Sequence, residues 1–137
     1  MILTTVAVAS LVAVTPTIAA FPVAASNPPS GPTVIATTSI WTDIVDQLDC
    51  HDHFTIESLV PTGADPHAYE PSLADADRLA AAALVVANGS GLEESLGDTV
   101  AAAGERGTSI VTMTDFVDTL DGDPHIWLDP TLVIATL

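Results

Sequence analysis

From residue 33 onward, short runs of β-branched and apolar residues alternate with segments that have the apolar spacing of helices. Strand–helix alternation of this kind is typical of βαβ units, which form a parallel sheet with helices on its faces. The sequence therefore predicts an α/β fold built on a parallel sheet of about four strands flanked by helices. The expected strands are residues 33–38, 54–60, 84–88 and 109–113.

The segments between these strands carry helix signals. Residues 39–49 are predicted to form an amphipathic helix from the spacing of their apolar side chains, which are Trp41, Ile44, Val45 and Leu48. Ser72 and Asp75 have the spacing of a capping box, in which each side chain binds the backbone N–H of the other residue. Ser90 and Glu93 have the same spacing, so we expect Ser90 to cap a helix that stops near Gly104.

Residues 1–25 have the composition of a secretory signal peptide. They contain no charged side chain, and a long apolar run is followed by small residues and a suitable cleavage site before Ser26. This pattern predicts export to the periplasm or the extracellular space. An uncleaved membrane anchor is the alternative, although Pro16 and Pro22 interrupt a span that is already short for a bilayer. Residues 26–32 are expected to form a disordered leader, and residues 33–137 the folded lobe.

Composition excludes several classes of function. The net charge is −16, with 18 acidic residues against two arginines, so nucleic acid and anionic membranes are repelled and cations are attracted. Cys50 is the only cysteine, which excludes an internal disulfide and leaves no cysteine for a lipid anchor after the signal peptide. No metalloprotease, nucleophile-elbow, Walker or dinucleotide motif occurs, so we expect a soluble binding protein rather than an enzyme.

The tripeptide Asp-Pro-His occurs twice, at residues 65–67 and 123–125, and the chain has only four histidines. The first copy follows the second expected strand, and the second copy comes shortly after the fourth. In parallel sheets, ligands bind at the loops beyond the carboxyl ends of the strands. We therefore expect His67 and His125 to lie at one edge of the same sheet.

Imidazole is a good ligand for zinc, manganese and related ions, and a bound histidine usually donates its second N–H to a carboxylate or carbonyl. The nearby acids that could support the histidines or orient their loops are Asp65, Glu70, Asp123 and Asp129. Two histidines do not complete a tetrahedral site, so other ligands are required. The alternative for both motifs is an ordinary Asp-Pro turn with a loop histidine.

The segment DCHDHF at residues 49–54 concentrates Cys50, His51 and His53 in one short stretch. It lies between the first helix and the second strand, which places it at the opposite edge of the sheet from the Asp-Pro-His motifs. Adjacent ligands in a short loop rarely surround one ion, so the segment is interpreted as a solvated turn with incidental metal binding.

The motifs, in this order, resemble those of the zinc/manganese solute-binding receptors of bacterial ABC importers, a family that includes proteins described as adhesins. The segments that carry the resemblance are VIATTSIWTDIVDQL, ESLVPTGADPHAYEPS, ADRLAAAALVVANGSGLE and DPHIWLDP. The resemblance covers about residue 33 to the end of the chain. It implies the N-terminal lobe of a bilobal fold like that of periplasmic binding proteins, cut at the start of the helix that links the lobes.

The resemblance also implies a function. His67 and His125 correspond to the metal ligands of the first lobe, and the other ligands would come from a second lobe that residues 1–137 do not include. It implies a monomeric receptor that binds zinc or manganese and delivers the ion to an ABC permease. An adhesin-like surface module with incidental metal binding and a truncated product without function remain as alternatives. An exported metal-dependent hydrolase is a further alternative, for which the sequence has no motif.

Overall fold

The structure is a computed structural model that describes residues 31–137, so the predicted signal peptide and most of the predicted leader lie outside the described residues. Strands and helices alternate along the chain as expected. They are β1 (Thr33–Ala36), α1 (Ser39–Leu48), β2 (Thr55–Ser58), α2 (Leu73–Ala81), β3 (Leu84–Ala87), α3 (Gly97–Glu105), β4 (Ser109–Thr112) and α4 (Pro130–Thr136). Short 3-10 turns lie at Glu94–Leu96, Met113–Phe116, Leu120–Gly122 and Ile126–Leu128.

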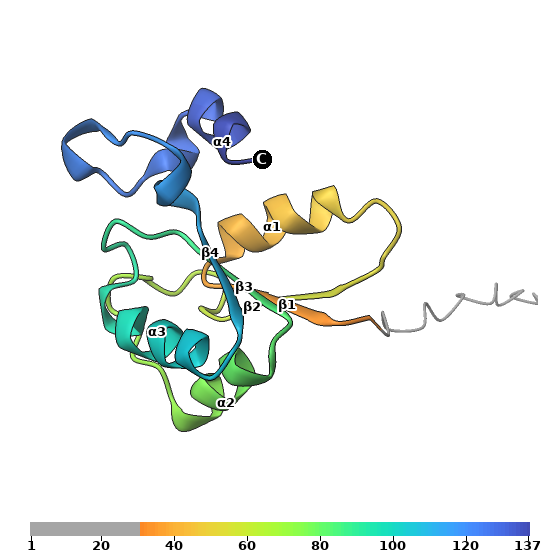
Figure 1. The fold of residues 1–137 in the computed structure, drawn as a ribbon. Helices are drawn as coiled ribbons and strands as arrows, with labels where there is room; N and C mark the ends of the chain where they lie inside the picture. The colour runs from red at the N-terminus through yellow and green to blue at the C-terminus, as the bar shows by residue number, and fades with distance from the viewer. Residues whose placement is uncertain (1–30) are drawn as a thin grey trace, which may run out of the picture.

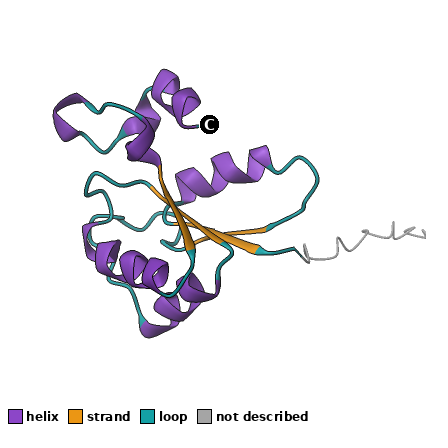
Figure 2. Ribbon diagram, in the orientation of Figure 1, coloured by secondary structure: helices purple, strands orange, loops and turns teal. Residues whose placement is uncertain are grey.

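The strands form one parallel sheet in the order β2-β1-β3-β4. β1 and β3 are the central strands and are apolar along almost their whole length, as expected for strands that are covered on both faces. Figure 2 shows the twisted strands enclosed between helices. The predicted α/β fold with a parallel sheet is therefore confirmed. Because the chain leaves β1 toward β2 and later returns to β3 on the other side, the strand order reverses between β1 and β3.

Helices cover both faces of this sheet (Figure 1). α2 and α3 lie on one face, and α1 and the segment after β4 lie on the other. Successive residues of β1 point to opposite faces, so Ile35 packs with Leu79 of α2 while Val34 packs with Trp41 of α1. Among residues 31–137, every helix is too short or too polar to cross a bilayer.

The capping box at Ser72 and Asp75 is confirmed, with both reciprocal hydrogen bonds present at the start of α2. The capping box predicted at Ser90 is wrong. Ser90 has a φ of 48°, whereas a capping residue is normally extended, and α3 begins only at Gly97. The helix also passes through Gly104 and ends at Glu105, shortly before Gly107, whose φ of 102° is typical of a helix-terminating glycine.

Candidate metal site

His67 and His125 lie side by side in space, although they follow the two outermost strands of the sheet. Their ring centres are 5.7 Å apart and the ring planes are inclined by 53°. Because a metal–nitrogen bond is about 2.0–2.1 Å long, two imidazoles that share one ion have ring centres roughly 5–6 Å apart. The structure therefore brings the two predicted residues together at a spacing that suits ligands of a single ion.

The two Asp-Pro-His motifs have the same local geometry. In each motif, the aspartate Oδ1 accepts a hydrogen bond from the backbone N–H of the histidine, at 2.9 Å between Asp65 and His67 and 3.0 Å between Asp123 and His125. Proline suits the middle of such an Asx turn because its φ is preset and it has no N–H to leave unpaired. The repeated tripeptide is therefore a turn that sets the direction in which each histidine leaves the backbone.

His125 has a further contact that orients its ring. Its Nδ1 lies 2.6 Å from Oδ1 of Asp123, which leaves Nε2 as the nitrogen available to a ligand. Hydrogen bonds from the backbone and the side chain of His125 lower the pKa of Asp123, so this carboxylate is ionised at neutral pH. The edge of Trp127 packs against His125 with ring centres 5.1 Å apart, and Trp127 also lines a small cavity with Pro66 of the first motif. Trp127 thus connects the two loops.

The two other predicted acids are placed differently. Asp129 is the N-cap residue of α4, and its carboxylate accepts hydrogen bonds from the hydroxyl of Thr131 at 2.6 Å and from the backbone N–H of Thr131 at 2.8 Å. These bonds lower the pKa of Asp129. Glu70 is exposed in the loop that follows His67. The ligand role of His67 and His125, and the supporting role of the four acids, stay predictions.

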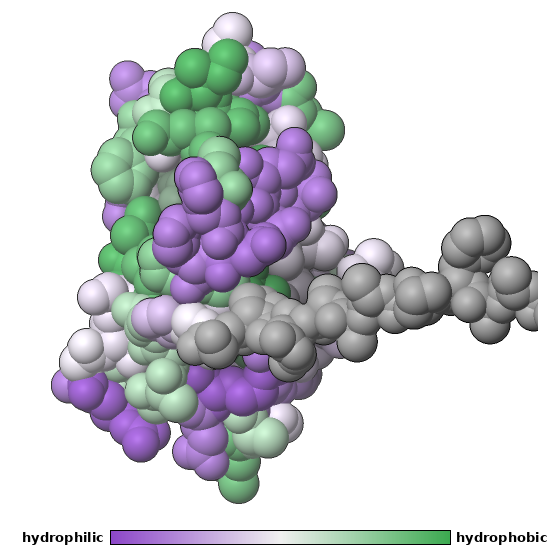
Figure 3. Space-filling view, turned by 90° about the vertical axis from the view of Figure 1, so that its right-hand side faces the viewer, coloured by the Kyte–Doolittle hydropathy of each residue, from purple (hydrophilic) through white to green (hydrophobic). Residues whose placement is uncertain are grey.

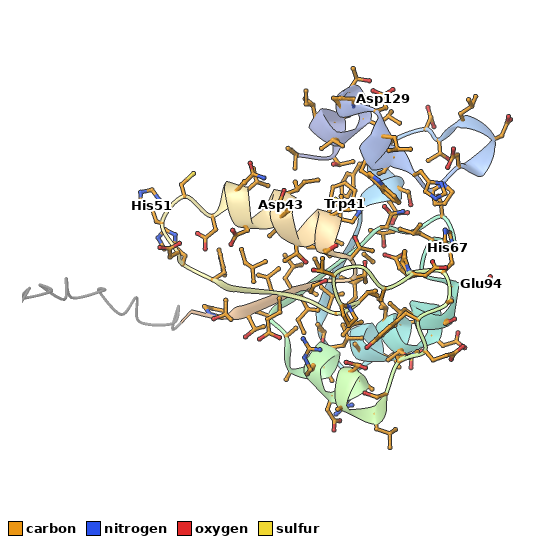
Figure 4. The ribbon with its side chains drawn as sticks, turned by 180° about the vertical axis from the view of Figure 1, so that it is seen from behind. Trp41, Asp43, His51, His67, Glu94 and Asp129 are labelled. Atoms are coloured by element: carbon orange, nitrogen blue, oxygen red, sulfur yellow. The ribbon has the colours of Figure 1, made fainter. Side chains whose placement is uncertain are left out.

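Two imidazoles leave a coordination shell incomplete, since zinc usually has four ligands. In the described part of the chain, no three histidine, cysteine, aspartate or glutamate side chains are arranged to hold a metal ion. The arrangement can therefore supply two nitrogen ligands, and water or groups from outside residues 31–137 would supply the others. The DCHDHF segment does not contribute to this site, because His51 and His67 lie at opposite ends of the molecule (Figure 4).

Asn88 has a positioning role that no sequence pattern indicated. It follows β3 and its side chain is fully buried. Its Oδ1 accepts a hydrogen bond from Trp41 Nε1 at 2.8 Å, and its Nδ2 donates to the carbonyls of Gly89 at 3.0 Å and Pro124 at 2.9 Å. Because Pro124 directly precedes His125, Asn88 fastens the second histidine loop to the centre of the sheet. The only available signal was a polar residue at the end of a buried strand.

Glu93 stabilises the loop that carries Asn88. Its carboxylate is buried and accepts hydrogen bonds from the backbone N–H groups of Asn88 and Gly89, at 2.9 and 3.2 Å, and from the hydroxyl of Thr37. Gly89 is required in this loop because its φ is +87° and an added Cβ would lie 2.3 Å from the side chain of Thr112. Glu93 therefore accepts hydrogen bonds from the N–H groups of this loop and does not form the capping box that was predicted with Ser90.

The first histidine loop is fastened by Asp75. Besides the capping bonds of Ser72, the Asp75 carboxylate accepts a hydrogen bond from the hydroxyl of Tyr69 at 3.0 Å and one from Arg78 Nη1 at 3.2 Å. Tyr69 lies two residues after His67 and packs against the core on the α2 face of the sheet. Asp75, the acidic member of the α2 capping box, therefore also holds the loop that carries His67.

We expect Asp75 to make folding stability sensitive to acid. Burial by itself raises the pKa of Asp75, but the hydrogen bonds from Ser72, Tyr69 and Arg78 outweigh burial and lower it. A carboxylate whose pKa is lowered by folding stabilises the fold above its unfolded pKa of about 3.9 and loses that contribution as the pH falls through the folded value. Asp75→Asn should therefore lose about 1.5–3 kcal/mol of unfolding free energy at neutral pH and show a flatter acid profile.

Urea unfolding between about pH 7 and about pH 3 measures this effect. Asp77→Asn is the matched control, because Asp77 is exposed on the same helix. An acid profile of Asp75→Asn that is as steep as that of the unchanged chain would contradict the assignment.

Comparison with known proteins identifies the family of this chain. The family model described as "ZnuA: Zinc-uptake complex component A periplasmic" matches residues 34–137. The chain is 34% identical over 119 residues to the metal ABC transporter substrate-binding lipoprotein SsaB of Streptococcus sanguinis, covering 77% of this chain and 38% of SsaB. It is 31% identical over 102 residues to the manganese-binding lipoprotein MntA of Halalkalibacterium halodurans, covering 70% of this chain and 33% of that protein. The chain thus spans about a third of the length of the curated relatives it matches.

Solved structures agree with the fold. The periplasmic zinc-binding protein TroA of Treponema pallidum superimposes with a TM-score of 0.67 at 27% identity, over 78% of this chain and 41% of TroA. The manganese-bound periplasmic metal-binding protein of Candidatus Liberibacter asiaticus superimposes with a TM-score of 0.68 at 29% identity, over 77% of this chain and 41% of that one. This coverage fits the predicted N-terminal lobe of a bilobal fold. From the extent of the family match and the identity to these relatives, the chain belongs to the ZnuA family.

Proposed function

We propose that this protein captures a divalent transition-metal ion outside the cytoplasm and that His67 and His125 are ligands of that ion. The observation that carries the proposal is the pairing of the two imidazoles, 5.7 Å apart, from loops that follow the two outer strands. Two identical Asx turns orient the histidine backbones, and Asp123 orients one ring. A net charge of −16 favours the approach of a cation.

The geometry supports binding rather than catalysis. The loops that carry the imidazoles are fastened to the sheet by Asn88 and to α2 by Asp75, which suits a site that presents fixed ligands. The proposal covers both zinc and manganese as the captured ion, because imidazole binds either ion. The ligands that complete the coordination shell would decide between them. The relatives' names mention both metals.

We infer that the captured ion is delivered to the permease of an ABC importer, because the relatives are named as substrate-binding components of such transporters. In this proposal the protein is exported as a monomer after cleavage before Ser26, and residues 26–32 form the leader that precedes the folded lobe. The alternatives of an adhesin-like module and of a product without function have no support from the comparisons.

Metal uptake by the source cells tests the proposal. Deleting the gene should lower cellular zinc or manganese when that metal is scarce in the medium, and excess metal should restore it. Reintroducing the gene should restore uptake, whereas the version with both His67→Ala and His125→Ala should not. The protein recovered from the cells in which the unchanged gene was reintroduced should lack residues 1–25. Normal zinc and manganese content in the deletion strain under limitation of each metal would overturn the proposal.

A further inference from the structure

A second group of metal-ligating side chains lies at the opposite end of the molecule from His67. The loop of residues 49–54 joins the end of α1 to the start of β2, at the amino edge of the parallel sheet, and Figure 4 shows His51 there. This position confirms the expected separation of DCHDHF from the Asp-Pro-His motifs. The arrangement of its side chains, however, differs from that of a simple solvated turn.

His51 and His53 form a close pair of imidazoles. Their ring centres are 5.3 Å apart and the planes are inclined by 49°, which is nearly the geometry of the His67 and His125 pair. Asp52 between them has a φ of 52°, so the backbone bends there into a conformation that a residue other than glycine rarely adopts. The spacing falls within the range of roughly 5–6 Å for two imidazoles on one ion.

Asp49 orients one ring of this pair. Its side chain is only 7% exposed, and its Oδ1 lies 3.2 Å from Nδ1 of His53 while its Oδ2 accepts a hydrogen bond from the backbone N–H of Phe54 at 2.8 Å. The contact leaves Nε2 of His53 free, as the Asp123 contact does for His125. A carboxylate on the second nitrogen is the usual support of a metal-bound histidine.

Cys50 supplies a third ligand type. Its side chain is exposed and lines the same open surface cavity of about 500 Å³ as Asp49, His51 and His53. Figure 3 faces this end of the molecule, where hydrophilic residues form a continuous area. As they stand, no three ligating side chains among residues 31–137 converge on one point, so the site requires a rotation of the Cys50 side chain about its single rotatable bond toward the ring pair.

We propose that Cys50, His51 and His53 form a second metal site, supported by Asp49, that takes a borderline-soft ion of the zinc class. A thiolate and two imidazoles are ligands that zinc and Co²⁺ accept readily, with water in the fourth position. Manganese prefers oxygen ligands and is not bound at this loop. The second site is therefore distinct in place and in selectivity from the pair at His67 and His125.

Titration of the full chain with Co²⁺ under reducing conditions tests this site, because a thiolate bound to Co²⁺ produces a charge-transfer absorption in the near ultraviolet. The unchanged chain should develop this band with the intensity of one thiolate-bound Co²⁺ per chain once Co²⁺ is in excess of both sites, and Zn²⁺ but not Mn²⁺ should abolish it. Cys50→Ser should remove the band. His51→Ala with His53→Ala should weaken the Co²⁺ binding that the band reports by about 10–100-fold or more.

The matched control is His67→Ala with His125→Ala, which should keep the band at full intensity and so separates this site from the proposed cargo site. Far-ultraviolet circular dichroism verifies that each variant is folded. The proposal is overturned if the unchanged chain shows no band, if the His51 and His53 variant binds Co²⁺ as tightly through Cys50 as before, or if the band disappears in the control.

Discussion

Replacing His125 by alanine is expected to reduce the affinity for the captured ion more than 100-fold. Loss of a supporting partner of a ligand already costs about 10–100-fold, and loss of the ligand itself removes a metal–nitrogen bond as well. A 100-fold loss corresponds to about 2.7 kcal/mol of binding free energy. His67→Ala should have a similar effect, because its imidazole lies beside that of His125, with 5.7 Å between the ring centres.

Calorimetric titration with Mn²⁺ and with Zn²⁺, on the protein as its own cells produce it, measures this loss. His51→Ala is the matched histidine control with Mn²⁺, since the thiolate-containing loop is not expected to take this ion. Asp123→Asn should cause an intermediate loss of about 10–100-fold, because it keeps the side-chain shape but weakens the support of His125. Unchanged affinity for both ions in His67→Ala and His125→Ala would show that the two histidines are ordinary loop residues.

The second large effect is expected from Asn88→Ala, which should lower the free energy of unfolding by about 2–4 kcal/mol. The variant leaves the buried indole N–H of Trp41 and the backbone carbonyl of Pro124 without the Asn88 side chain as their hydrogen-bond partner. An unsatisfied buried polar group costs about 1–3 kcal/mol, and the missing side-chain atoms leave a void in addition. The ion affinity should fall as well, because the loop of His125 loses its attachment to β3.

Urea unfolding followed by tryptophan fluorescence measures the stability change. Gln47→Ala is the matched control, since this amide on α1 is exposed and donates hydrogen bonds to Asp43 of the same helix, so its loss should cost less than about 0.5 kcal/mol. A loss below about 1 kcal/mol for Asn88→Ala would contradict the anchoring role. If the stability falls but the ion affinity is unchanged, Asn88 supports the fold without positioning His125.

The strand and helix order could be predicted because it depends on local patterns. The β-branched and apolar runs at β1 and β3 and the apolar face of α1 specify their elements within a few residues. The spacing of Ser90 and Glu93 wrongly predicted a capping box, and the reason is physical. A glutamate carboxylate can accept N–H groups from a helix start or from a tight loop, and only the packing of Thr37 and Asn88 around Glu93 selected the loop.

The sequence by itself determined the chemistry and the edge of the candidate site. Two Asp-Pro-His turns that follow strands of one parallel sheet are expected at its carboxyl edge, since every strand of such a sheet points the same way. The tertiary structure decided what depends on residues far apart in the chain. These are the meeting of His67 with His125, the hydrogen bond from Asn88 to Pro124 and the contact of Tyr69 with Asp75. Local patterns carry no information on such contacts, because packing on both faces of the sheet creates them.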